Sequence, residues 1–190
     1  AADSADINGE SIDDALRFAN FFTRGTLGLD LQEDILSWLT GDFAVTFALA
    51  DSFPASMEAM NSASEMPVEF GLLFEATNPD QATALVAGLR RAAETAAEDN
   101  DQISVESAVE GGAEALRVTI DSADAPFDIV LMAGATDNVF ILGTEHMVAA
   151  ALNPVAGLDT DPLFQEASAY VLPNAAQVWY FAGDALMPLV

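Results

Sequence analysis

The stretch GLDLQEDILSWLTGDFAVTFALAD, residues 28–51, decides the fold. Asp30 is placed to cap a helix, because its carboxylate can accept hydrogen bonds from the free amides two and three residues later, and Glu33 stands at the capping-box position. The apolar stripe that follows is too broad for an exposed helix, and Gly41 is expected to end it. Large and small apolar residues then alternate over residues 43–49, which is typical of a strand. The stretch therefore predicts a helix, a tight turn and a strand.

A looser copy of this pattern, GLDTDPLFQEASAYVLPNAAQVWYFAGD, occupies residues 157–184. Pro162 predicts the first turn of a second helix, and the apolar run 178–181 predicts a strand that we expect beside residues 43–49. The repeat suggests three segments: an N-terminal tail and helix, an α+β unit, and the start of a second helix–strand repeat that completes or extends the same domain. These segments cover residues 1–26, 27–153 and 154–190.

An amphipathic helix is predicted ahead of the opening stretch. Ser11 is placed to cap it and Gly25 to end it. One face of this helix is apolar. Its members are Ile12, Leu16, Ala19 and Phe22, with Phe18 beside them.

The residues between the two copies predict a meander of strands and two further helices. A strand over residues 68–74 precedes the longest helix, which starts at Asn78 and Pro79. Four strand candidates follow between residues 103 and 142, and Thr144 is placed to cap a short helix. Connections this short join antiparallel neighbours. The fold class is therefore expected to be α+β: a twisted, mainly antiparallel sheet of about six or seven strands, with helices packed mostly on one face and a weak internal helix–strand repeat.

The charge balance excludes two classes of partner. The chain has 31 acidic and 5 basic residues, a formal net charge of -26, and every basic residue is an arginine. Nucleic acids and anionic membrane surfaces are bound by clustered lysine and arginine, which this chain lacks. The acid excess has two interpretations: a solvated surface on an exported protein, or adaptation to high salt. Either one allows weak, diffuse binding of divalent cations.

No residue pattern points to catalysis or to a cofactor. Cysteine is absent, so thiol chemistry, disulfides and thiolate metal sites are excluded. His146 is the single histidine, and no serine stands in a nucleophile elbow; we expect this histidine on the surface. The pair Gly111 and Gly112 lies between strands and has no lysine nearby, unlike a phosphate-binding loop. The sequence therefore predicts a protein that is not an enzyme and that holds no cofactor.

Carboxylate clusters are the candidates for a metal site, since calcium takes oxygen ligands. Asp121, Asp124 and Asp128 are the candidate ligands, and shorter pairs occur at residues 99 and 101 and at residues 159 and 161. None of these groups has the spacing of an EF-hand loop. With so many acids in the chain, close pairs are expected by chance.

The compartment is expected to be extracytoplasmic. No apolar run approaches the roughly 20 residues of a membrane-spanning helix. The start AADSAD is typical of a mature chain after cleavage of a leader peptide between small residues. We expect the sequence to be a piece of a longer protein that is secreted, periplasmic or on the cell surface.

Four segments resemble a bacterial family known as domain of unknown function 3352. They are GLDLQEDILSWLTGDFAVTFAL, VEFGLLFEATNPDQATALVAGL, NVFILGTEHMVAAAL and DPLFQEASAYVLPNAAQVWYFAGD, which together reach from residue 28 to residue 184. The resemblance lies in patterns of apolar residues. It implies an exported or membrane-anchored extracytoplasmic protein, and it supplies no catalytic residues.

Three functions are compatible with these patterns. The first is a non-enzymatic extracytoplasmic module of the surface or envelope, which acts through self-assembly or through an unknown protein partner. The second is a carrier of an apolar ligand between sheet and helices, with the methionine-rich segment 51–66 as a lid. The third is an acidic, cation-binding or salt-adapted surface protein.

Overall fold

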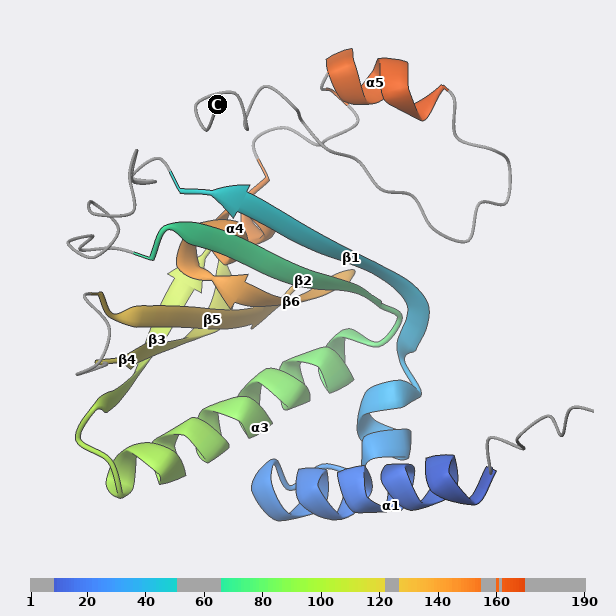
Figure 1. Cartoon of the computed structure of the whole chain (residues 1–190), viewed down its shortest axis with the longest axis vertical. Coiled ribbons are helices and arrows are strands. Elements are labelled where there is room, and N and C mark those ends of the chain that lie inside the picture. Colours follow the sequence, from blue (N-terminus) through green and yellow to red (C-terminus); the bar gives the residue numbers. More distant parts are fainter. Residues whose placement is uncertain (1–8, 51–65, 122–126, 155–159, 161, 170–190) are drawn as a thin grey trace, which may run out of the picture.

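The structure is a computed structural model that describes residues 9–50, 66–121, 127–154, 160 and 162–169. These residues form an open, twisted antiparallel sheet of six strands with helices packed against it (Figure 1). The predicted α+β fold is confirmed. The elements in chain order are α1 (Gly9–Thr26), the π-helix η1 (Leu31–Leu36), β1 (Leu39–Leu49), β2 (Val68–Ala76), α3 (Pro79–Glu98), β3 (Ile103–Glu110), β4 (Ala113–Ile120), β5 (Ile129–Ala135), β6 (Val139–Thr144), α4 (Glu145–Leu152) and α5 (Pro162–Ser168).

The strand order is β1-β2-β6-β5-β4-β3, so the chain builds the sheet from both edges toward the middle. β1 and β2 form one hairpin, α3 carries the chain to the opposite edge, and β3 to β6 return as the predicted meander. The tight turn between β3 and β4 consists of Gly111 and Gly112, with φ of 57° and 86°. Two successive positive φ values are the conformation that a two-residue hairpin turn needs and that glycine adopts without strain.

One face of the sheet is covered by α3 and by the segment around η1. Ala82, Leu85 and Val86 of α3 are buried against the central strands. Trp38, which is 1% exposed, packs edge-to-face on Phe140 with ring centroids 6.1 Å apart. Its Nε1 donates to the backbone oxygen of Asp34 at 2.6 Å, so the ring is buried with its polar atom satisfied.

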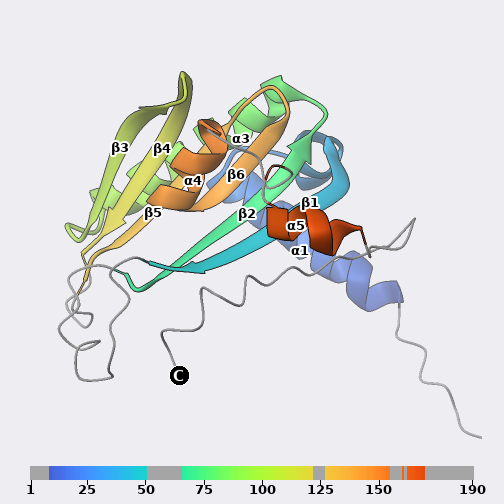
Figure 2. The ribbon, with the colours of Figure 1, turned by 90° about the horizontal axis from the view of Figure 1, so that it is seen from above.

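The other face is covered by α4, as Figure 2 shows from above. Val148 and Leu152 of this helix pack on Met132 and Ile141 of the central strands. Glycine permits the close contact there: a Cβ added at Gly134 would lie 2.6 Å from Leu152 Cδ1. The sheet therefore has a core on each face, with the long helix on one side and the short helix on the other.

The opening stretch differs from its prediction at the helix end. The helix is a short π-helix that ends at Leu36, and β1 begins at Leu39 and includes Gly41, so the predicted helix end at this glycine is wrong. The cause is Trp38, whose carbonyl oxygen accepts hydrogen bonds from the backbone N and the Oγ1 of Thr77, at 3.2 and 2.9 Å. These bonds hold the chain extended one turn earlier than the sequence indicates.

The second copy of the pattern is described only in part. The predicted helix start at Pro162 is confirmed by α5. The predicted strand over residues 178–181 lies outside the described residues, as does the methionine-rich segment except for Met66. The three-segment division of the chain stays a prediction.

Candidate functional site

Two of the three predicted metal ligands, Asp121 and Asp128, lie at one end of the sheet. Asp121 follows β4 and Asp128 precedes β5, next to the paired residues Ile120 and Ile129. Asp124 lies outside the described residues, so the three-residue site stays a prediction. Within the described part of the chain, no group of three or more histidine, aspartate or glutamate side chains is arranged to hold a metal ion.

His146 is exposed on the first turn of α4, as predicted. Its Nδ1 lies 2.8 Å from Glu69 Oε2 on β2, which is the arrangement that orients a catalytic imidazole. The neighbouring hydroxyl of Thr144, however, is engaged with the backbone: it accepts from Phe70 N and donates to Phe70 O, both at 3.3 Å. The His146–Glu69 pair therefore links α4 to β2, and the Thr144 hydroxyl beside it is not free to act as a nucleophile.

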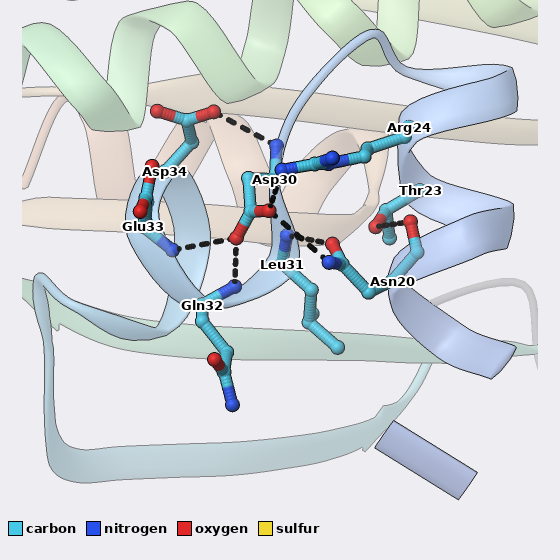
Figure 3. A network of polar contacts seen from close by, with 8 residues as sticks. All are labelled: Asn20, Thr23, Arg24, Asp30, Leu31, Gln32, Glu33 and Asp34. Carbon is cyan, nitrogen blue, oxygen red and sulfur yellow. Dashed lines mark hydrogen bonds and ion pairs between the residues drawn. The ribbon is translucent and has the colours of Figure 1, made fainter. Parts of the chain in front are cut away.

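The best-connected polar group is the carboxylate of Asp30, which caps η1 (Figure 3). Its Oδ1 accepts from Gln32 N and Glu33 N at 2.9 Å each. Its Oδ2 accepts from Asn20 Nδ2 at 3.1 Å and forms an ion pair with Arg24. The N–H of Glu33, followed by the amide of Asn20, lowers the pKa of Asp30 to about 2. An ionised carboxylate this fully bonded is a structural joint between α1 and η1 and is unsuited to proton transfer at neutral pH.

The capping box is closed by a different residue from the one predicted. Asp34 Oδ2 accepts from the backbone N of Asp30 at 2.8 Å, which is the reciprocal bond that the sequence assigns to Glu33. The π-helical turn explains the change, because its wider spacing brings the residue four positions on, instead of three, back to the cap. Asn20 Oδ1 adds a bond from Leu31 N at 2.7 Å.

Substituting Asp30 by asparagine is expected to change how stability depends on pH. The folded pKa of about 2 lies below the ordinary aspartate pKa of 3.8, so the ionised carboxylate stabilises the fold above about pH 4, and this contribution is lost as the pH falls through 2. Thermal melts of wild type and Asp30→Asn should therefore differ most near neutral pH and converge toward pH 2. Asp101→Asn, at an exposed turn, controls for the loss of one charge. Parallel profiles of wild type and Asp30→Asn would contradict this assignment.

Arg117 is a second structural joint, on the face that α4 covers. Its Nη1 lies 3.0 Å from Glu106 Oε2 on β3, and its Nε lies 3.3 Å from Glu145 Oε1 at the start of α4. The hydrogen bond with Glu145, and after it the contact with Glu106, raises the pKa of Arg117. The side chain ties two strands to the helix.

A pocket of about 250 Å³ lies between α3 and the strands β4 and β5. Half of its lining residues are polar or charged, and the guanidinium of Arg90 already donates to Ala115 O at 3.3 Å and to Ser107 Oγ. Sites for small organic ligands are usually about 300–1,000 Å³ and mainly apolar. The pocket is smaller and partly charged, so it does not favour a carrier function. Its lining residues are Thr83, Val86, Ala87, Arg90, Glu114 and Ala135.

The feature best suited to an interaction is an exposed apolar surface on β1 and β2. Phe43 is 60% exposed and Phe47 is 72% exposed, and Val45 and Val68 are exposed beside them; we call these four residues the β1 face. The register pairs Phe43 with Phe74, which belongs to the core under α3, so the β1 face continues that core beyond the reach of the helix. The rings of these two phenylalanines pack together, with centroids 6.3 Å apart. The sequence predicts the alternation but not its exposure.

β1 is also an edge strand of the described sheet. It has 11 residues, with Asp42 as its single charge and no proline or lysine. Natural edge strands are usually protected against pairing by such residues or by being short. Within the described residues no strand pairs with the outer edge of β1. The edge and the β1 face together form the candidate site.

A second exposed apolar surface lies on α1. Phe18, Phe21 and Phe22 share one side of the helix and are 60% to 78% exposed; we call them the α1 face. These phenylalanines are exposed because α1 meets η1 through the polar side that carries Asn20 and Arg24. The sequence shows an amphipathic helix but not which side docks.

No described helix is long and apolar enough to cross a membrane. Comparisons of the chain with family models, with curated proteins and with solved structures found no match. The resemblance to domain of unknown function 3352 therefore stays a prediction.

Proposed function

We propose that this chain is a non-enzymatic, extracytoplasmic module of the cell surface or envelope that acts through self-assembly or through binding of a protein partner. The observation that carries the proposal is the β1 face, beside an edge of β1 with which no described strand pairs. Contiguous exposed apolar side chains favour association, since each buried Å² of apolar surface contributes about 25 cal/mol. An open edge strand adds main-chain donors and acceptors for a partner strand.

The polar groups of the described residues support the non-enzymatic part. The carboxylate of Asp30 and the guanidinium of Arg117 are already bonded in contacts that hold neighbouring elements together. His146 and Glu69 pair beside a hydroxyl that is bonded to the backbone. The extracytoplasmic part rests on the family resemblance and on the strongly acidic composition.

Photo-crosslinking tests the proposal. A photoreactive benzoyl-phenylalanine at position 47 should give a discrete cross-linked product in cells that express the full protein, whatever the partner is. Val109 is a matched control, because it is 70% exposed on the opposite edge strand and should give far less product. Equal labelling from both positions, or none from position 47, would contradict an interaction at the β1 face.

Turnover of an ester, glycoside or peptide substrate that an acidic-residue substitution abolishes would contradict the non-enzymatic part.

A further inference from the structure

Two apolar surfaces are exposed among the described residues, the β1 face and the α1 face. The large residues of β1 are on the face of the sheet that α3 covers, and helix α1 lies on that same side of the sheet (Figure 1). Neither is a scatter of single residues: the first continues the core through Phe74, and the second is a row of three phenylalanines. An occupant that explains both surfaces at once is preferable to one that explains either alone.

A second copy of the chain satisfies this condition by two-fold symmetry. In a two-fold dimer each copy supplies both halves of a self-complementary interface, so the α1 face of one copy can cover the β1 face of the other, and the reverse. With about 200 Å² for a phenylalanine side chain, the exposed fractions amount to roughly 800 Å² of apolar surface per copy. Two copies would then bury about 1,600 Å², the standard size of a stable interface.

The distribution of charge fits the same occupant. A second copy carries the same net charge of -26, so a contact must avoid juxtaposed acids. Residues 15–26, which hold the α1 face, contain Arg17 and Arg24 and no acidic residue. This part of α1 therefore presents a helical surface without acidic residues to another acidic chain. β1, with its single Asp42, is a correspondingly weakly charged target.

We propose that this chain forms a two-fold dimer in which the α1 face of each copy covers the β1 face of the other. The dimer rests on the proposed function and names the partner as a second copy. It also accounts for the exposure of the large residues of β1 in the described part of the chain: the helix that covers them belongs to the partner. The site is complete only in the dimer, because each contact takes its α1 face from one copy and its β1 face from the other.

The first test is the mass of the full chain in solution, by light scattering and by sedimentation at several concentrations. The expected species is twice the 19.9 kDa of one chain. Phe47→Glu and Phe21→Glu should each raise the dissociation constant at least about 30-fold, because each buries a charge at the centre of the contact. Val109→Glu should leave it unchanged. All three positions are exposed, so circular dichroism should show the wild-type fold.

The second test fixes which surfaces meet. The chain has no cysteine, so Phe21→Cys and Phe47→Cys introduce single reactive thiols. Mixing the two variants with a short bismaleimide should give a dimer band that each variant alone does not give. A band from Phe47→Cys alone would show edge-to-edge pairing of β1 and overturn this arrangement. A cross-link confined to one chain in the double variant would show that the chain covers itself, and would also overturn it.

The outcomes separate the dimer from the proposed function. A chain that stays monomeric while position 47 cross-links to a different protein in cells would overturn the dimer and leave the proposed function standing. A chain that stays monomeric and binds vesicles of zwitterionic lipid through the α1 face would also overturn the dimer. A monomer without any cross-link at position 47 would overturn both.

Discussion

Trp38→Ala is expected to lower the free energy of unfolding by about 3–5 kcal/mol. The indole is 1% exposed and lies where η1, α3 and the sheet meet. It packs against the ring of Phe140, which in turn packs against the ring of Phe74. Its removal leaves a cavity that β6 and α3 cannot close without breaking strand pairing. Chemical denaturation followed by far-ultraviolet circular dichroism measures the loss. Circular dichroism is preferable to fluorescence, because Trp179 also emits.

Trp38→Phe is the matched variant. It keeps an aromatic ring against Phe140 and removes the hydrogen bond from Nε1 to Asp34 O, so it should cost clearly less than alanine. Equal losses for both variants would mean that the hydrogen bond, and not the packing, holds this corner. A loss below about 1 kcal/mol for Trp38→Ala would contradict the buried position of the indole.

Local signals were sufficient for most of the fold. The meander over β3–β6 and the start of α3 after Asn78 follow from turn residues, a cap and alternation that act within a few positions. The helix after Thr144 begins as predicted, but the Thr144 hydroxyl bonds to Phe70 and not to the helix amides. The end of η1 was missed because it depends on bonds from Thr77 to Trp38, 39 positions away in the chain. Sequence spacing carries no signal for such a contact.

The candidate site was missed for a different reason. Alternation over residues 43–49 shows that a strand has one face of large residues, but a covered face and an uncovered face have the same pattern. The phenylalanines of α1 pose the same ambiguity. A signal was present there: Asn20, Thr23 and Arg24 form a polar side opposite them, and that side makes the contacts of α1. The exclusions drawn from charge and from cysteine content concern other classes of function and give no position for a site.

Gly143→Ala is expected to be among the most damaging changes of a single methyl group within the sheet. Gly143 of β6 is paired with Gly71 of β2, and a Cβ at position 143 would lie 2.2 Å from Phe70 O and 2.8 Å from Gly71 Cα. These are backbone atoms of the neighbouring strand, so no side-chain rotation relieves the clash. β2 must move away from β6, which would separate the β1–β2 hairpin from the rest of the sheet. A loss of about 3 kcal/mol or more follows, at or above the upper end for overpacking.

Gly25→Ala is the control, because it adds the same methyl group where nothing lies within 4 Å, inside α1. Alanine there should leave stability unchanged or raise it by about 0.5–1 kcal/mol, since glycine is the weaker helix former. Thermal melts of both variants distinguish steric conflict from a general effect of replacing glycine. The expected failure mode is also specific: Gly143→Ala should lose hydrogen-exchange protection first in β1 and β2, while β3–β5, held by their own pairing and by α3, stay protected longer. Uniform loss across all six strands would show instead that the hairpin and the meander fold as one cooperative unit.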